Sequence, residues 1–236
     1  MLTLLRSPKL TSLGFVHGFG TRHADVGSAA TPALRQTALA QLKQAANGVF
    51  DFAEVEQVHG KDVASPTSSG KSDVKADAVR IATPNVAAAI RTADCVPVLL
   101  AHRRSGAVVA AHAGWRGLVA GVIEEAIRSL GDGREIVCAI GPCISATAFE
   151  IGPEVAESLV RKVDDTSVVL KKGESHYGDL QLAVKLVLGR MNVPFSSIDR
   201  LEHCTFTEED LFFSHRRDRT SGRQLSFIAP TSRSTS

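Results

Sequence analysis

A cysteine and a histidine bracket two apolar runs in the stretch "RTADCVPVLLAHRRSGAVVAAHAGWRG", residues 91 to 117. The runs "CVPVLLAH" and "GAVVAAHAG" are rich in strand-forming residues, and "RRSG" between them is typical of a hairpin connection. A turn centred in that connection pairs residues whose numbers sum to 209, so Cys95 lies opposite Gly114. His112 then shares a face with Cys95, at the roughly 7–8 Å Cα separation of diagonal neighbours. At that separation a thiolate and an imidazole can hold one metal ion or form one catalytic dyad.

His59, in "EQVHGKDV", ends a predicted strand just before Gly60 and is a third candidate. Zinc is commonly held by three protein ligands with an open fourth position, and cysteine and histidine are suitable ligands. The set His59, Cys95 and His112 fits that requirement. The three are 36 and 17 residues apart, however, and the chain has no compact CxxC or HxxxH motif. Spacing alone therefore does not separate a zinc site from hydrogen-bonded histidines at strand ends and a small buried cysteine.

Arginines are concentrated in "FFSHRRDRTSGRQ", residues 212 to 224, which carries four arginines against one aspartate. Guanidinium groups bind phosphate and carboxylate through paired hydrogen bonds, so the segment is either an anion site or a solvated loop. Arg216 is expected to pair with Asp218 or a nearby glutamate, which leaves Arg217 and Arg223 as the stronger anion ligands. The stretch "GFGTRH" lacks the final glycine of a dinucleotide fingerprint and the lysine of a P-loop, so neither motif is assigned.

The remaining cysteines and histidines have weaker patterns. Cys138 and Cys204 lie in predicted apolar strands and are expected in the core, whereas Cys143 follows a Gly-Pro turn and either lines a cleft or packs. The histidines without a partner pattern are expected to be structural or exposed: His17, His23, His102, His176 and His203.

Bulk composition places the chain among ordinary globular proteins. It has 236 residues, 44% of them hydrophobic and 22% charged, enough to bury a core. The apolar runs are far shorter than a membrane span, and the N-terminus lacks the pattern of a secretory signal. Four widely spaced cysteines argue against a disulfide framework, so we expect a cytoplasmic protein. The net charge of +2 says little about partners, and neither nucleic acid nor a membrane is expected.

Hydrophobic periodicity predicts a single α+β domain over residues 1–230, with mixed β-sheets flanked by helices, and a flexible tail over 231–236. Helices are predicted from their period, first-turn proline or terminal glycine over 31–46, 118–131, 152–162 and 179–191. Strands are predicted over 52–60, 85–94, 135–142, 198–205 and 223–230, together with the hairpin. The polar stretch 65–73 is predicted to be a loop.

Seven short motifs occur along the chain in one order: "EQVHG", "ADAV", "TADCVPVLL", "AAHAGWRG", "AIGPCISATAFEIG", "GDL" and "SHRRDRTSGRQ". In these motifs the chain resembles the YfiH or laccase-domain family, also called the multicopper polyphenol oxidase or purine nucleoside phosphorylase family. The combination of "TADC" with "HAGWRG" is highly specific. The resemblance implies a fold similar to that of deamidating toxins.

The resemblance also implies a function. One zinc ion per chain is expected on His59, Cys95 and His112, with phosphorolysis of adenosine, inosine, guanosine or methylthioadenosine and adenosine deamination as a second activity. The partners are then a small nucleoside and phosphate, and the protein is expected to be a monomer or a dimer. Cys95, His112 and Asp94 are the expected catalytic residues, with Asp94 as the general acid because it adjoins a proposed ligand. Substrate or phosphate is expected to bind the arginines Arg22, Arg116, Arg217 and Arg223.

Three departures from the family pattern predict a different substrate range. The segment "TRHADVGSAATPALRQ" stands where the family usually has Gly-Gly and later Asn-Leu-Gly. His215 replaces a frequent tyrosine of the arginine motif, and Val184 replaces an expected asparagine.

Other classes of function stay open. Cys95 activated by His112 is also the nucleophile expected of a cysteine amidase, such as one that edits peptidoglycan precursors. A copper polyphenol oxidase is disfavoured because its several copper centres need more histidines than the eight present. The HxE and PCxxC signature of base-flipping deaminases is absent, so deamination here requires another set of residues. A binding module without catalysis is the remaining alternative.

Overall fold

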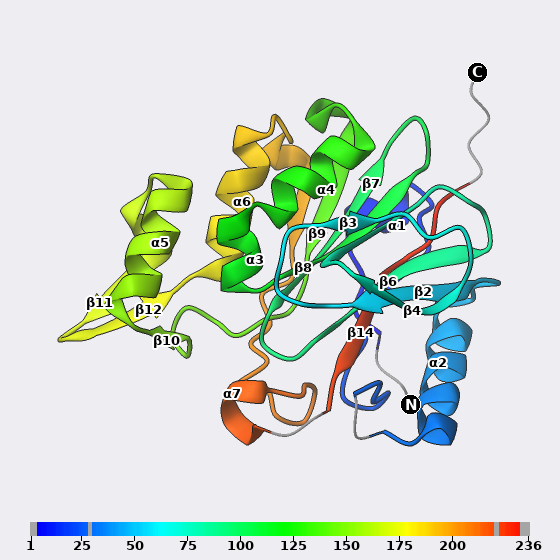
Figure 1. The fold of residues 1–236 in the computed structure, drawn as a ribbon, viewed down its shortest axis with the longest axis horizontal. Coiled ribbons are helices and arrows are strands. Elements are labelled where there is room, and N and C mark those ends of the chain that lie inside the picture. The colour runs from blue at the N-terminus through cyan, green and yellow to red at the C-terminus, as the bar shows by residue number, and fades with distance from the viewer. Residues whose placement is uncertain (1–3, 28–29, 220–221, 232–236) are drawn as a thin grey trace.

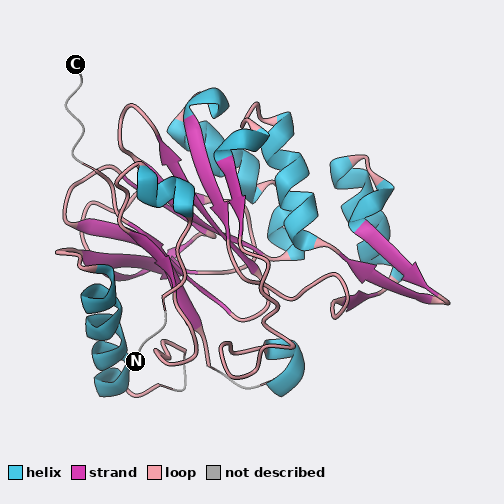
Figure 2. Cartoon of the chain, turned by 180° about the vertical axis from the view of Figure 1, so that it is seen from behind, coloured by secondary structure: helices cyan, strands magenta, loops and turns pink. Residues whose placement is uncertain are grey.

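The computed structural model describes residues 4–27, 30–219 and 222–231 and arranges them in four layers, with two β-sheets packed face to face between helices (Figures 1 and 2). The predicted α+β class is confirmed. Among the described helices none has the length and hydropathy that a bilayer crossing requires. The tail predicted over 231–236 lies, apart from Thr231, outside the described residues.

The larger sheet has six strands in the order β13-β9-β7-β8-β5-β3. They are β3 (Val63–Ala64), β5 (Ala78–Ile81), β7 (Val96–His102), β8 (Val108–Ala113), β9 (Ile136–Ile140) and β13 (Ile198–Arg200). Both faces of its central strands are covered, which is why those strands are apolar at nearly every position. On β7, Val98 and Leu100 face helices, whereas Leu99 and Ala101 face the second sheet.

The second sheet has five strands in the order β1-β14-β6-β2-β4. They are β1 (His17–Phe19), β2 (Asp51–Glu56), β4 (Gly70–Lys75), β6 (Val86–Thr92) and β14 (Gln224–Ile228). On β6, Ala88 and Ile90 pack toward the larger sheet, and Ala87 and Ala89 pack toward a helix on the outer face. The sheets therefore enclose an apolar layer, and the side chains at its end can face one another across it.

The described helices are α1 (Pro8–Ser12), α2 (Pro32–Ala46), α3 (Trp115–Ala120), α4 (Val122–Leu130), α5 (Pro153–Val163), α6 (Leu180–Arg190) and α7 (His215–Asp218). Four of them cover the two outer faces of the sheets. Helices α3, α4 and α6 cover the larger sheet, and α2 covers the smaller one through Ala38, Leu42 and Ala46 (Figure 1). Short 3₁₀ turns occur at Gly133–Glu135, Thr166–Val168 and Phe195–Ser197.

A small unit projects to one side of the four layers (Figure 1). It consists of α5 and a three-stranded sheet of β10 (Glu150–Ile151), β11 (Val169–Lys172) and β12 (Ser175–Gly178). Val155 and Leu159 of α5 pack into the same core as the helices of the larger sheet, which ties the unit to the body.

The predicted hairpin register is confirmed. Strands β7 and β8 pair Val96 with Ala113 and Pro97 with His112, and both pairs sum to 209. The predicted helices at 31–46, 152–162 and 179–191 also form. The first begins as its sequence indicates, because the Thr31 hydroxyl accepts from the Leu34 amide and Pro32 occupies the first turn.

Four predicted elements were wrong in extent. The strand over 52–60 ends at Glu56, so His59 lies in the loop that follows β2 and does not end a strand. The single helix over 118–131 is two helices, because Gly121 adopts a φ of 106° and breaks the hydrogen-bond ladder between α3 and α4. The loop over 65–73 ends early, since Gly70 begins β4 and pairs with β2. The strand over 198–205 stops at Arg200, and beyond it Cys204 forms only an isolated bridge.

Candidate active site

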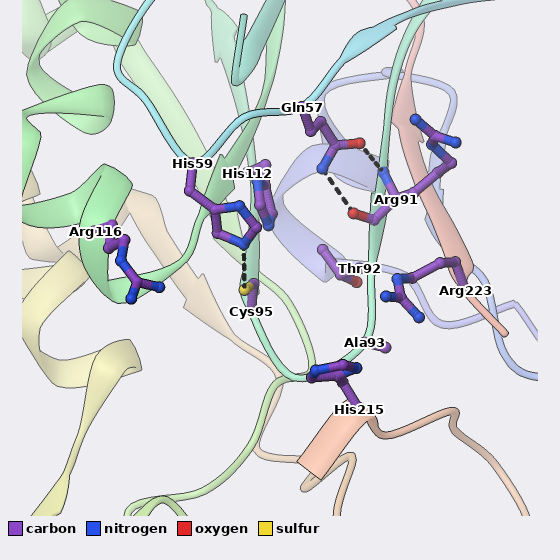
Figure 3. Close-up of a pocket in the computed structure, with 10 residues that line it drawn as sticks. All are labelled: Gln57, His59, Arg91, Thr92, Ala93, Cys95, His112, Arg116, His215 and Arg223. Atoms are coloured by element: carbon purple, nitrogen blue, oxygen red, sulfur yellow. Dashed lines mark hydrogen bonds between the residues drawn. The ribbon is translucent and has the colours of Figure 1, made fainter. Parts of the chain in front are cut away.

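A cavity of about 490 Å³ opens at one end of the layer between the two sheets (Figure 3). His112 near the end of β8 alternates in phase with Val108 and Ala110, whose side chains face the smaller sheet. Cys95, just before β7, has the same phase as Leu99. The cavity is lined by Gln57, His59, Arg91, Thr92, Ala93, Cys95, His112, Arg116, His215 and Arg223, and we call it the cluster cavity.

The three predicted metal ligands meet in the cluster cavity, and we call them the His59–Cys95–His112 cluster. Their ligand atoms all lie within 4.8 Å of one another. The Cys95 Sγ atom is 3.9 Å from His59 Nε2, and the two imidazole rings meet edge to face at 4.8 Å between centroids. His59 is exposed, Cys95 is half-buried and His112 is buried, so the cluster has one side open to small molecules.

The donors of this cluster fit a tetrahedral metal ion. Zinc bonds of about 2.3 Å to sulfur and 2.0–2.1 Å to nitrogen place a tetrahedral sulfur–nitrogen pair roughly 3.6 Å apart. The observed distance between Cys95 Sγ and His59 Nε2, 3.9 Å, is slightly longer. A small side-chain adjustment brings the two atoms to the tetrahedral separation. The Nδ1 atom of His112 is already bonded to Asp77, which leaves its Nε2 atom for a metal.

The buried carboxylate of Asp77 holds both histidines of the cluster. It accepts hydrogen bonds from His112 Nδ1 at 2.7 Å and from the successive amides of Val58, His59 and Gly60 at 3.1, 3.0 and 2.6 Å. Burial raises the pKa of Asp77, but the hydrogen bonds from His112 and the Gly60 amide outweigh it and leave the pKa below its ordinary value. Asp77 therefore stays ionised and fixes the His112 tautomer.

Sequence reasoning did not single out Asp77. Its signal was an acidic residue inside the apolar motif "ADAV", because a buried carboxylate requires charged or hydrogen-bonding partners. Those partners come from two other segments of the chain, so the motif alone does not name them.

Backbone geometry brings the ligands close together. His59 adopts a φ of 61°, in the left-handed region, and its loop thereby turns three amides toward Asp77. A Cβ atom at Gly114 would lie 2.9 Å from the Cys95 sulfur, and one at Gly117 would lie 2.9 Å from the Gly60 carbonyl oxygen. The glycines of "HAGWRG" are therefore required by close approach to the cluster and its loop.

Cys95 and His112 form a charge pair. Burial raises the pKa of the Cys95 thiol, but the His112 charge and hydrogen bonds from both histidines bring it down to about 6. Burial lowers the pKa of His112, but the Cys95 charge and the hydrogen bond to Asp77 bring it up to about 9. Near neutral pH the metal-free site therefore holds a thiolate beside an imidazolium, which suits either metal binding or nucleophilic catalysis.

The four predicted anion-binding arginines lie in different places. Arg116 and Arg223 line the cluster cavity (Figure 3). Arg116 is exposed and its guanidinium lies 4.5 Å from the Trp115 ring, whereas Arg223 is half-buried and donates from its backbone amide to Asp25. Arg22 does not line this cavity, because its guanidinium donates to the Glu209 carbonyl and lies over an aromatic ring.

Arg217 holds the C-terminal loop together. Its guanidinium forms two hydrogen bonds of 2.9 Å with Asp218 and donates to the carbonyls of Thr205, Phe206 and Phe212. Arg217 is absent from the wall of the cluster cavity, which corrects the expectation that it faces phosphate there. The expected pairing of Arg216 with Asp218 is also corrected, because Arg217 makes it.

Asp94, the expected general acid, has its carboxylate turned away from the cluster cavity. One oxygen accepts from the Thr205 hydroxyl at 2.7 Å and the other from the Arg216 amide at 2.6 Å. Its own φ is 88°, and its carbonyl accepts from the Ile144 amide. Asp94 therefore holds the strained turn that precedes Cys95, and it does not line the cavity.

Residues that were not predicted complete the wall. Gln57 exchanges two hydrogen bonds, of 2.8 and 2.9 Å, with the backbone of Arg91, while the Arg91 guanidinium pairs with Glu54 at 3.5 Å. His215 lines the cavity from α7. Its replacement of the family's frequent tyrosine is therefore a change at the site. Val184 lies fully buried in α6, so that departure concerns the core.

The chain is similar to known proteins both in sequence and in structure. A family model described as multi-copper polyphenol oxidoreductase laccase matches residues 21–231, which include the whole cluster. The purine nucleoside phosphorylase YfiH of Escherichia coli (strain K12) is 42% identical over 176 residues, 74% of this chain and 72% of that protein. The adenosine deaminase RL5 of an unknown prokaryotic organism is 34% identical over 149 residues, 60% of this chain and 56% of that protein. The crystal structure of YlmD from Geobacillus stearothermophilus has a TM-score of 0.84 at 28% identity, covering 98% of this chain and 96% of that chain.

The Asp77→Asn variant is predicted to bind a divalent metal about 10- to 100-fold more weakly, because the amide neither carries the charge nor accepts all the hydrogen bonds of the carboxylate. Competition with a chromophoric chelator during Zn²⁺ titration measures this. Asp199→Asn is the matched control, since that carboxylate is bonded by Ser7 and Lys9 outside the cavity. Equal metal affinity in both variants and the parent protein, with Asp77→Asn folded, would show that Asp77 does not support the cluster.

Alkylation of Cys95 in metal-free protein is predicted to follow a titration midpoint near pH 6, with the reactive thiolate present above it and lost below it. Iodoacetamide rates across pH, assigned to Cys95 by peptide mapping, give the midpoint. His112→Gln removes the neighbouring positive charge and should move the midpoint upward. A midpoint close to the ordinary thiol value of 9.0 in the parent protein contradicts the charge pair.

Proposed function

The chain belongs to the multi-copper polyphenol oxidoreductase laccase family, also called YfiH, and on that premise we propose that it is a zinc-dependent purine nucleoside phosphorylase. Its substrates are phosphate and adenosine, inosine, guanosine or methylthioadenosine. The observation that carries this proposal is the His59–Cys95–His112 cluster in the wall of a cavity that also presents Arg116 and Arg223. The relative named purine nucleoside phosphorylase YfiH supports the choice of reaction.

Zinc is proposed on the chemistry of the donors. One thiolate and two imidazoles suit zinc with an open position, although a single copper centre uses a similar set. Multicopper oxidation needs further groups of histidines, and among the described residues one group of three donors comes together. Two of the other histidines have structural partners, since His17 accepts from the Ser7 amide and His203 pairs with Glu208.

Each part of the site has a role in phosphorolysis, in which phosphate attacks the ribose C1′ atom and the purine leaves with the bonding electrons. A cavity of about 490 Å³ is within the usual range for small-molecule sites. Arg223 and Arg116 supply guanidinium groups that hold and orient phosphate through paired hydrogen bonds. His59, Cys95 and His112 would hold a zinc ion that supplies a Lewis acid in the same cavity. Asp77 keeps the cluster aligned. His215 contacts the substrate from the position at which the family that the chain resembles frequently has tyrosine.

Adenosine deamination is proposed as a second activity of the same cavity. The relative named adenosine deaminase RL5 supports it. Deamination needs an activated water in place of phosphate, and a three-ligand zinc site with an open position is suited to activating one.

The alternative is a cysteine amidase in which the Cys95 thiolate is the nucleophile. The low pKa of Cys95, about 6, and the adjacent His112 favour it as the second candidate. The two proposals differ in their need for metal, because a thiolate bound to zinc is not free to attack an amide.

Purified protein is predicted to contain one zinc per chain and to release purine base only when phosphate is present. Complete demetallation should abolish this activity and re-addition of Zn²⁺ should restore it. His59→Ala, Cys95→Ser and His112→Ala should each lose zinc and turnover together, as measured by elemental analysis and base release from a nucleoside panel. Copper as the bound metal, or amide hydrolysis that survives demetallation and is blocked by alkylating Cys95, refutes the proposal.

Arg223→Lys is predicted to raise the KM for phosphate by about tenfold or more, equivalent to roughly 1.4 kcal/mol, because an ammonium cannot make the paired hydrogen bonds of a guanidinium. Initial rates at varied phosphate measure this. Arg217→Lys is the contrast variant from the same loop. It should lower the melting temperature while leaving the phosphate dependence unchanged, since its partners are Asp218 and carbonyl oxygens. If Arg217→Lys raises the KM for phosphate and Arg223→Lys leaves it unchanged, Arg223 does not belong to the phosphate site.

A further inference from the structure

Two cysteines outside the cluster, Cys143 and Cys204, are neighbours on an isolated parallel β-bridge. The Cys143 amide donates to the His203 carbonyl at 3.4 Å, and its carbonyl accepts from the Thr205 amide at 2.9 Å. Bridge partners have their Cα atoms about 4.8 Å apart and direct their side chains to the same face. That separation is inside the range of roughly 4.4–6.8 Å that disulfides require.

Both thiols lie at a second cavity of about 240 Å³, which we call the thiol cavity. None of its lining residues is shared with the cluster cavity. Its wall includes the polar residues Ser145, Asp179 and Arg200. Cys204 is 9% exposed and Cys143 only 2%, so a small reagent in this cavity meets Cys204 first.

The hydrogen bonds differ between the two sulfur atoms. Cys204 Sγ accepts from the Ser145 amide at 3.3 Å, whereas Cys143 Sγ donates to the Ile144 carbonyl at 3.2 Å. Burial raises the pKa of Cys204, but hydrogen bonds from Ser145 and Thr207 leave it below its ordinary value. Burial raises the pKa of Cys143 well above its ordinary value. This is the arrangement of an attacking thiolate beside a resolving thiol.

We propose that Cys143 and Cys204 form a dithiol modification site that hydrogen peroxide closes to a disulfide. The Cys204 thiolate attacks one peroxide oxygen, the O–O bond breaks, and the second oxygen leaves as hydroxide, which takes up a proton to form water. The Cys143 sulfur then attacks the Cys204 sulfenic acid, loses its proton and expels a second water. Two thiols are oxidised and one peroxide is reduced.

The two cysteines also adjoin the turn that positions Cys95. Ile144, next to Cys143, donates its amide to the Asp94 carbonyl at 3.0 Å. Thr205, next to Cys204, donates its hydroxyl to the Asp94 carboxylate at 2.7 Å. Formation of the disulfide therefore links the two segments that hold Asp94, the residue that precedes the cluster ligand Cys95.

Peroxide treatment of the full-length protein tests the proposal. After oxidation, free thiols are blocked with N-ethylmaleimide and the protein is digested with trypsin. The expected product is a link between the peptides 135–161 and 201–216 that dithiothreitol releases. Peptide 135–161 also contains Cys138, so tandem mass spectrometry and the Cys138→Ala variant both assign the linked sulfur.

Single substitutions separate the two roles. Cys143→Ala should abolish the link and leave a Cys204 sulfenic acid that dimedone labels, whereas Cys204→Ala should leave Cys143 unoxidised. Cys138 is the internal control, because it is fully buried in β9 and its pKa is raised by burial. The proposal is overturned if Cys204 passes directly to a sulfinic acid while Cys143 stays a free thiol. It is equally overturned if both thiols remain as unreactive as Cys138.

Discussion

The carboxylate of Asp77 is the point on which the site depends. It is fully buried, yet it remains charged because the imidazole of His112 and three consecutive amides around His59 donate to it. A buried charge without such partners is costly, so the loop and the strand end are held in the one arrangement that satisfies it. That arrangement is also the one that brings two imidazoles to a thiolate. Stability of the fold at this end and alignment of the cluster therefore have the same cause.

The four-layer architecture explains why the cavity lies where it does. Apolar side chains from both sheets fill the layer between them along most of its length, from Ala53 and Ile90 on one sheet to Leu99 and Ala110 on the other. At one end the same faces carry polar residues, and packing gives way to a cavity. Its wall comes from the ends of β6 and β8, from α3 and α7, and from the loops that follow β2 and β6 and precede β7 and β14. A scaffold buried on both faces can support strained backbone at Asp94 and at His59.

The chemistry proposed for this cavity follows from a small number of donors. A thiolate and two imidazoles form one centre, and the guanidinium groups of Arg116 and Arg223 lie in the same wall. The family description mentions several copper ions, but the described donors come together as one group of three. Arg217 and Asp94 serve the site indirectly, because one secures the C-terminal loop and the other the turn before Cys95.

Local patterns in the sequence were sufficient to predict part of the fold and part of the site. The hairpin register follows from turn length and the two-residue period of strands, so the proximity of Cys95 and His112 could be predicted, as could the start of α2 at Thr31. The hydrogen-bond partners of Asp77, Asp94 and Arg217 could not be predicted from the sequence. Asp94 meets Arg216 across 122 positions and Asp77 meets His112 across 35. Which buried carboxylate receives which donor is decided when distant segments pack together, because hydrogen bonds need atomic contact and the residue pattern encodes only periodicity and propensity.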